Sequence, residues 1–163
     1  MGVAIVRAEA DDTEAFIRLR ACTRENAIQA ERLAQIGITA ATWAADMRAN
    51  HVLGFVAKQG EALLGYCFGE VDTGEVLVLA LLPEAEGQGL GRQLLQRVVQ
   101  ALHIGGHSRL FLSCAANPAL RSHGFYRHLG WRPTGEVDAH GDEVLELTLA
   151  PPPPPGSAVS RPS

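Results

Sequence analysis

Three glycines at alternate positions, Gly87, Gly89 and Gly91, are the most distinctive chemical feature of the sequence. They follow an apolar stretch, Glu75–Leu82, which ends at a proline, and they open into a segment with leucines and valines at helical spacing. The amino end of a helix offers unpaired N–H groups and partial positive charge, and glycines let the backbone approach a phosphate closely. The pattern therefore predicts a strand, a phosphate-binding loop and a helix.

Two other kinds of phosphate-binding loop do not fit these residues. A Walker A loop needs a lysine after its last glycine, and no lysine is present here. A dinucleotide-binding loop of the form G-x-G-x-x-G would place its third glycine at Arg92. It also needs an acidic residue about 20 positions later, and the next acidic residue is Glu136. A dinucleotide-dependent oxidoreductase is therefore only a distant alternative.

This loop and a second motif resemble the GNAT superfamily of N-acetyltransferases, which use acetyl-coenzyme A. The family signature is Gln/Arg-x-x-Gly-x-Gly/Ala, and the stretch from Glu86 to Gly91 reads EGQGLG, with both glycines in place and Glu86 where the family has Gln or Arg. Downstream, Ser122–Trp131 resembles the family's A-x-x-F-Y-x-x-x-G-F segment, with substitutions at its first and last positions. The order of elements also agrees, so the resemblance covers about residues 3 to 149.

The resemblance implies where acetyl-coenzyme A binds. In the family, backbone N–H groups of the strand before the glycine loop stabilise the acetyl carbonyl, at a place where a bulge splays that strand from the next one. The loop and the start of the helix hold the phosphates. The implied cofactor-binding residues are Leu79, Ala80, Leu81, Gly87, Gln88, Gly89, Leu90, Gly91, Arg92 and Asn117, the last being the asparagine nearest to the family's position, which is Ala119 here.

Transfer of an acetyl group from a thioester to an amine needs an acid for the departing sulfur and a base for the amine. The resemblance implies Tyr126 as the acid, because a phenol can donate a proton to a forming thiolate. Glu75 is the implied base, since some family members place a catalytic glutamate at this offset. Regular alternation along the strand would put Glu75 on the same face as Leu77 and Leu79.

Other side chains could share this chemistry. Glu70 and Asp72 are rival bases, and a water relay can replace a side-chain base. Cys114 lies near the expected acetyl position, but a covalent acetyl-cysteine route is unusual in the family. Together with Cys22 and Cys67 it forms a widely spaced set that fits neither a disulfide framework nor a zinc cluster, so we expect free thiols in a reducing cytoplasm. The histidines show no metal-ligand spacing, and no metal is expected.

Composition and charge exclude several classes of protein. The 163 residues are 47% hydrophobic and 20% charged, which is ordinary for one globular domain. The longest apolar run, Val76–Leu82, is far shorter than the roughly 20 residues of a membrane helix, so no membrane association is predicted. The net charge is −4, yet residues 87 to 135 contain six arginines and no acidic residue. This asymmetry favours a small phosphorylated cofactor, whereas the acidic whole with a single lysine argues against nucleic acid.

The apolar periodicity and the order of elements predict an α/β protein with a mixed sheet. The resemblance implies a fold of the α+β type, with a GNAT-like, mostly antiparallel central sheet flanked by helices. The predicted element order is β-α-α-β-β-β-α-β-α-β-β. Strands are expected at residues 3–7, 52–57, 62–71, 75–82, 109–114, 131–138 and 143–149. Helical segments are expected from Asp11 or Asp12, at 26–35, at 40–49, from Leu90 and at 118–128. Residues 1–150 would form the domain, and the proline-rich residues 151–163 a disordered tail.

The resemblance therefore implies an N-acetyltransferase that moves an acetyl group directly from acetyl-coenzyme A to a primary amine of a small molecule or protein, and a cytoplasmic location is expected. The family binds its acceptor around the segments that correspond to Thr23–Asn26 and Asp138–Glu143, which carry charges of both signs here. Homodimers are common in the family. A catalytically idle acyl-coenzyme A sensor is the alternative, suggested by Glu86, because a carboxylate that faced a pyrophosphate would repel it.

Overall fold

The computed structural model describes residues 2–24 and 27–150, and the predicted tail at 151–163 lies outside this range. The strands are β1 (Ala4–Arg7), β2 (Val52–Gln59), β3 (Ala62–Glu70), β4 (Val76–Leu81), β5 (Arg109–Cys114), β6 (Arg132–Val137) and β7 (Glu143–Thr148). The helices are α1 (Thr13–Arg20), α2 (Ala30–Gln35), α3 (Ala40–Arg48), α4 (Leu90–Ile104) and α5 (Arg121–His128), with short 3-10 turns η1 (Ala10–Asp12) and η2 (Pro83–Ala85).

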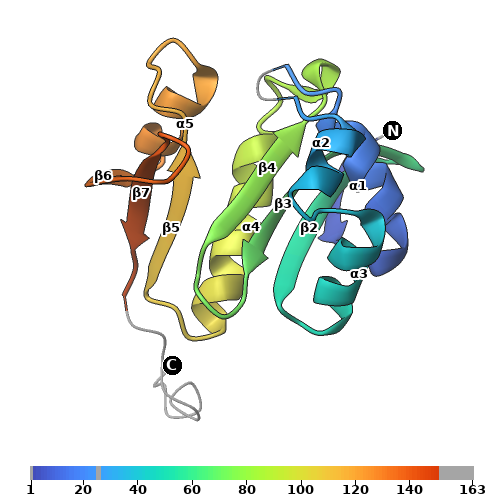
Figure 1. Cartoon of the computed structure of the whole chain (residues 1–163), viewed down its shortest axis with the longest axis horizontal. Coiled ribbons are helices and arrows are strands. Elements are labelled where there is room, and N and C mark those ends of the chain that lie inside the picture. The colour runs from blue at the N-terminus through green and yellow to red at the C-terminus, as the bar shows by residue number, and fades with distance from the viewer. Residues whose placement is uncertain (1, 25–26, 151–163) are drawn as a thin grey trace.

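The strands form two antiparallel sheets, one in the order β1-β2-β3-β4 and the other in the order β5-β7-β6. The sheets meet where β4 and β5 begin, through a parallel bridge between Glu75 and Phe111 and a hydrogen bond from the Phe111 N–H to the Gly74 carbonyl, 3.3 Å long. Beyond this point the two strands diverge toward their carboxyl ends, and α5 and the loop after β4 lie at the wider end (Figure 1). The predicted fold class, a mostly antiparallel mixed sheet flanked by helices, is confirmed.

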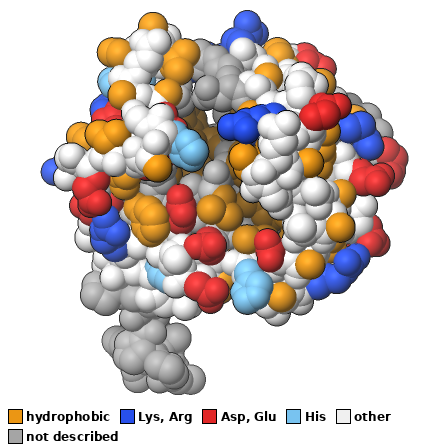
Figure 2. All heavy atoms as spheres, viewed as in Figure 1, with side chains coloured by type: hydrophobic (Ala, Val, Ile, Leu, Met, Phe, Trp, Pro, Cys, Tyr) orange, Lys and Arg blue, Asp and Glu red, His pale blue; other side chains and the backbone are white. Residues whose placement is uncertain are grey.

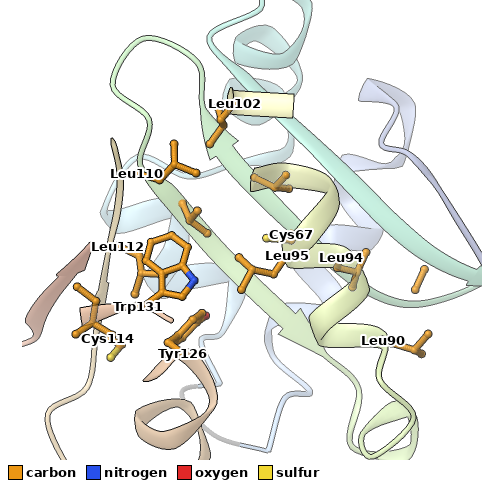
Figure 3. Packing of buried hydrophobic residues seen from close by; sticks show 14 of the residues in the cluster. Cys67, Leu90, Leu94, Leu95, Leu102, Leu110, Leu112, Cys114, Tyr126 and Trp131 are labelled. Atoms are coloured by element: carbon orange, nitrogen blue, oxygen red, sulfur yellow. The ribbon is translucent and has the colours of Figure 1, made fainter. Parts of the chain in front are cut away.

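Helix α4 fastens the two sheets to each other. Its leucines and valines recur at helical spacing and are buried, and they share one core with Cys67 of β3, Leu110 and Leu112 of β5, and Trp131. Figure 3 shows these side chains converging on the space between α4 and both sheets. Gly69 lets the helix approach β3, since a Cβ at that position would lie 2.8 Å from Leu102 Cδ1 and 2.9 Å from Val98 Cγ1.

A cluster of four aromatic rings covers the opposite face of the first sheet. Phe16 of α1 and Trp43 of α3 pack on Tyr66 and Phe68 of β3, with ring centroids 5.1 to 5.9 Å apart in tilted or edge-on arrangements. The buried Tyr66 hydroxyl donates a 3.0 Å hydrogen bond to the Phe16 carbonyl. These contacts fix α1 on the sheet, and with it the side chains at the end of α1.

The structure corrects some details of the predicted elements. Three helices connect β1 and β2, in agreement with the three predicted segments, whereas the predicted element order counted only two. The second of them begins at Ala30, later than predicted. Helix α5 begins at Arg121 and not at Pro118, because the side chain of Asn117 accepts a hydrogen bond from the Ala119 N–H and holds the preceding residues in a turn. The strand ends differ from the prediction by one or two residues.

Within residues 2–24 and 27–150, the helices are all too short or too polar to cross a membrane.

The buried hydrogen bond of Tyr66 yields a prediction about stability. Tyr66→Phe keeps the ring in its cluster but removes the donor to the Phe16 carbonyl, so the free energy of unfolding should fall by about 1–2 kcal/mol. Urea denaturation measures this loss. The matched control is Tyr126→Phe, because Tyr126 is also a buried tyrosine but belongs to the other core and not to this aromatic cluster. Equal losses in the two variants would contradict the assignment.

Candidate active site

A cavity of about 420 Å³ lies between the end of α1, the end of β4, the loop that follows β4, and α5. Figure 2 shows a hollow in this face of the molecule, with hydrophobic side chains on its floor, basic side chains beside its upper part and acidic ones around its lower part. The structure brings most of the predicted site residues together on the cavity wall: Leu79, Ala80, Leu81, Gly87, Gly89, Leu90, Gly91, Arg92 and Tyr126.

The cavity exists because β4 parts from β5. Phe68 pairs with Val78, but the next residue of β3, Gly69, pairs with Val76, so Leu77 is an extra residue in β4. Such a bulge bends and twists its strand and ends regular pairing. It lies just beyond the bridge between Glu75 and Phe111, where the two sheets separate.

The parting leaves backbone groups of β4 facing the opening. The Leu82 N–H donates to the Leu64 carbonyl of β3. Because N–H groups alternate in direction along a strand, the N–H group of Ala80 also points to β3. Those of Leu79 and Leu81 therefore point away from β3, toward the opening. These two N–H groups are the ones available to a carbonyl oxygen. Of the three predicted donors, Leu79, Ala80 and Leu81, only the first and the last therefore face the opening.

The glycine loop turns the chain from β4 into α4 and exposes the start of the helix. Gly87 and Gly89 have φ angles of 80° and 78°, in the left-handed region that favours glycine. Gly89 is the N-cap, and no side chain caps the helix there. The first helical N–H groups are therefore free of a side-chain acceptor and face the cavity wall formed by Leu90, Gly91 and Arg92. A backbone of this kind suits a phosphate.

Glu86 does not stand as an unpaired carboxylate beside the loop. Its Oε1 accepts a hydrogen bond from Arg24 Nε at 2.8 Å and another from Arg121 Nη1 at 2.5 Å. The Glu86 side chain is only 17% exposed, whereas both arginine side chains are more than half exposed. All three line the cavity and carry one net positive formal charge, so the carboxylate holds two cations at the rim.

Two further observations indicate that these residues fit acetyl-coenzyme A. The Ser122 Oγ is buried, has no hydrogen-bond partner among the described residues, and belongs to the cavity lining. A bound ligand with polar atoms could satisfy it. A Cβ at Gly91 would lie 3.3 Å from Leu81 Cδ1 and 3.6 Å from the Phe125 ring, so a larger residue would fill this part of the cradle.

Tyr126 lies on the far side of the opening from β4, on α5. Its ring packs edge-on against Phe125 and Trp131, and Figure 3 shows it next to Trp131 and Cys114. Burial raises the pKa of the phenol, and the nearby thiols of Cys67 and Cys114 raise it further. The phenol therefore keeps its proton at neutral pH and is available as a proton donor.

The predicted face of Glu75 is wrong, because the strand is not regular up to that residue. Val76 and Leu79 belong to the same core, although residues three apart on a regular strand point to opposite faces. The bulge at Leu77 inserts one residue and so brings them to the same face. Glu75 alternates with Val76 and therefore does not share a face with Leu79. It lies at the closed end of the opening, where β4 and β5 are bridged.

The surroundings of Glu75 nevertheless change its acidity. Partial burial raises the pKa of its carboxyl, and the negative charges of Glu70 and Asp138 raise it further. Asp138 itself stays acidic, because hydrogen bonds from the backbone N–H groups of Asp142 and His140 lower its pKa. The pKa of Glu75 is therefore shifted toward neutrality, as a base requires.

Three predicted site residues do not line the cavity among the residues described: Glu75, Gln88 and Asn117. The Gln88 side chain donates to the Glu84 carbonyl at 3.3 Å, within its own loop. The Asn117 side chain is used in the turn before α5. Cys114 is buried, and burial raises the pKa of its thiol, which makes it a poor nucleophile. Across residues 2–24 and 27–150, no three His, Cys, Asp or Glu side chains are grouped to hold a metal ion.

Four lining residues were not predicted as site residues: Arg20 at the end of α1, and Arg121, Ser122 and Phe125 of α5. Thr23 and Arg24, which also line the cavity, belong to the segment predicted to lie near the acceptor, and the rest of that segment, residues 25–26, lies outside the described residues. The run of arginines without acidic residues pointed to Arg121 in general terms. For Arg20 no sequence signal exists, because it reaches the cavity only through the packing of α1 on the sheet.

Comparison with known proteins agrees with this geometry. The family model of the acetyltransferase (GNAT) family matches residues 13–131. Among curated proteins, a mycothiol acetyltransferase of Beutenbergia cavernae is 39% identical over 69 residues, which are 42% of this chain and 23% of that protein. The match thus spans about a quarter of the length of this relative.

Solved structures share the fold at low sequence identity. An acetyltransferase of the GNAT family from Desulfovibrio desulfuricans is 21% identical with a TM-score of 0.75, covering 91% of this chain and 100% of that one. The PaiA N-acetyltransferase of Thermoplasma acidophilum, solved with coenzyme A, is 18% identical with a TM-score of 0.70, covering 91% and 99%. The ribosomal-protein-S18-alanine N-acetyltransferase of Escherichia coli is 21% identical with a TM-score of 0.65, covering 96% and 97%.

The contacts of Glu86 predict that the effects of Arg121→Gln and Glu86→Gln on coenzyme A affinity do not add. Arg121→Gln removes a cation from the rim and also releases half of the pairing of Glu86, so coenzyme A should bind about tenfold more weakly. Adding Glu86→Gln should restore much of this loss, because the carboxylate left without its partner is then gone. Calorimetric titration of wild type, both single variants and the double variant measures the coupling.

Arg132→Gln is the matched control, since Arg132 is exposed on β6 and is not part of the cavity. Losses that simply add, or an Arg121→Gln variant that binds coenzyme A like wild type, would contradict this role of Glu86.

Proposed function

The chain belongs to the GNAT family of acetyltransferases, and we propose that it transfers the acetyl group of acetyl-coenzyme A directly to the primary amine of a small molecule or protein. The observation that carries this proposal is the opening between β4 and β5. At one end of it, two strand N–H groups, an uncapped helix start and a buried tyrosine face a single cavity. Acetyl-coenzyme A supplies the thioester, and the amine nitrogen gains the acetyl group while the sulfur gains a proton.

Binding would use mainly the backbone. The N–H groups at the start of α4 would hold the phosphates, helped by the positive end of the helix and by the arginines at the rim. The N–H groups of Leu79 and Leu81 would donate to the acetyl carbonyl oxygen, where negative charge develops during transfer. Preorganised donors of this kind lower the barrier because they need not reorient as the charge forms.

Proton transfer would be divided between two sides of the opening. Tyr126, whose phenol stays protonated, would give its proton to the departing sulfur. Glu75 would take the proton of the amine. A chain of water molecules would carry this proton from the amine to Glu75, because Glu75 lies at the closed end of the opening and outside the cavity that Tyr126 lines. The raised pKa of Glu75 suits this task, since the best base has a pKa near the working pH.

The acceptor is not fixed by the fold. The names of two relatives reported above refer to molecules as different as mycothiol and the alanine of a ribosomal protein. A cytoplasmic location remains part of the proposal, and it is supported by three cysteines that are all free thiols in the described residues.

A catalytically idle acyl-coenzyme A sensor remains the second candidate. The departure at Glu86 suggested it, but the pairing of Glu86 with two arginines removes the expected repulsion of a pyrophosphate. Release of free coenzyme A thiol in the presence of candidate amines separates the two functions. A sensor would bind the cofactor without any release of thiol above the rate without protein.

Tyr126→Phe tests the proposed acid. The change keeps the ring and its packing but removes the proton, so kcat should fall by roughly 10²–10⁴-fold. The dissociation constant of coenzyme A should change little, because the donor acts mainly when charge develops on sulfur. Steady-state kinetics and calorimetry on the same preparation measure both. A variant with wild-type kcat would remove Tyr126 from the mechanism.

Glu75→Gln tests the proposed base. A base acts in its deprotonated form, so wild-type kcat/KM should fall as the pH falls through the raised pKa of Glu75, at a higher pH than for an ordinary carboxyl. The Gln variant should lose this dependence and roughly a hundredfold in turnover at neutral pH. Its thermal stability should not fall, because the change relieves repulsion from Glu70 and Asp138. An unchanged pH profile in the variant would exclude Glu75.

A further inference from the structure

A second cavity, of about 340 Å³, lies on the face of β4 that α1, α2 and α3 cover. Its wall is mostly apolar, and the side chains that matter here are Ile28, Leu33, Trp43, Phe68, Leu77 and Val78. A volume in this range suits one aromatic or branched aliphatic group, since ligand pockets start at about 300 Å³.

This apolar cavity adjoins the proposed acetyl position. Val78 lines the apolar cavity and Ala80 lines the first one, and both belong to the core on the same face of β4. Two residues along a strand are about 7 Å apart. Arg20 of α1 lies in the walls of both cavities. The two cavities therefore adjoin each other both along β4 and at the end of α1.

The apolar cavity is also open at its rim. Ile36, Ile38 and Leu77 are 52%, 37% and 44% exposed, although each is a large hydrophobic residue. Leu77 is exposed because it is the extra residue of the bulge. Large hydrophobic side chains that gather at the mouth of one cavity mark a binding site rather than ordinary surface.

The charges near the two cavities are arranged for a cationic amine with an apolar neighbour. Glu75, two residues before Leu77, interacts with the carboxylates of Glu70 and Asp138. Figure 2 shows acidic side chains around the lower part of the hollow and hydrophobic ones on its floor. An ammonium group would be attracted to this end, while the apolar wall offers Arg20 and Asp46 as its only charged residues among those described.

We propose that the acceptor is a small primary amine that carries an aromatic or branched aliphatic group a few bonds from its nitrogen, with this group seated in the apolar cavity. The inference rests on the proposed acetyl transfer and names its substrate class. In the transfer, the new N–C bond replaces the C–S bond of the thioester. The ammonium gives one proton to Glu75 and becomes the attacking amine, and the sulfur takes the proton of Tyr126. The second nitrogen proton leaves as the adduct collapses and restores the phenol.

An acceptor panel tests the class. Phenethylamine and isoamylamine should be acetylated with at least tenfold higher kcat/KM than ethanolamine and putrescine, because the polar amines leave the apolar wall in contact with water. Thiol release reports turnover with each amine.

Two variants at the rim of the apolar cavity, with a matched control, test whether this cavity causes the preference for apolar amines. Leu77→Gln and Ile38→Gln change exposed side chains, so the fold should survive, and each should raise the KM for phenethylamine about tenfold. For Ile38→Gln the kcat/KM for ethanolamine and the affinity for coenzyme A should not change, because Ile38 lies outside the cavity proposed to hold the cofactor. Ile104→Gln, at a side chain that is 75% exposed at the end of α4 and outside both cavities, should behave as wild type.

The outcomes separate the two proposals. Turnover with every amine at similar kcat/KM, or rim variants that acetylate phenethylamine like the Ile104→Gln control, would overturn the acceptor class and leave acetyl transfer standing. Absence of thiol release with all four amines, while coenzyme A still binds, would overturn the acceptor class. If peptide amines also release no thiol, acetyl transfer to amines is overturned with it.

Discussion

The separation of β4 from β5 is the constraint on which the rest of the structure depends. Parallel neighbours in a sheet normally satisfy each other's backbone groups along their whole length. Here they pair only at Glu75 and Phe111, and the bulge at Leu77 then turns β4 away. Donors that face the opening have no strand to bind, so a ligand or water must take that place. Because β4 and β5 share so few backbone hydrogen bonds, other contacts must hold the two sheets at a fixed distance.

Those contacts are apolar, and they also set the geometry of the site. Helix α4 and Trp131 share one core with residues of both sheets, so the opening cannot close without disturbing buried side chains. The same helix begins at the glycine loop, which ties the position of its free N–H groups to the packing of its leucines. On the other face, the aromatic cluster around Phe16 and Tyr66 fixes α1, whose end supplies Arg20 to both cavities. Packing and chemistry therefore depend on the same few elements.

Sequence patterns predicted the parts of the site that are local in the chain. A strand followed by alternate glycines and an amphipathic helix is encoded within about twenty residues, and Tyr126 sits in a short motif. The contacts that were missed join distant segments. Glu86 meets Arg24 and Arg121 across sequence separations of 62 and 35 residues, and nothing local to Glu86 indicates either partner. The face of Glu75 was mispredicted for another reason, because a single inserted residue reverses the alternation and leaves no mark in the apolar pattern.

The central claim is that the parted strand and the uncapped helix bind coenzyme A through backbone N–H groups. Amide chemical shifts of the ¹⁵N-labelled protein during a coenzyme A titration test it most directly, because they report on each N–H group separately. The account predicts the largest changes at Leu90, Gly91 and Arg92 and at Leu79 and Leu81, with a smaller change at Ala80, whose N–H group points to β3. Saturation by coenzyme A with the largest changes elsewhere, or with Leu79 and Leu81 unaffected, would contradict it.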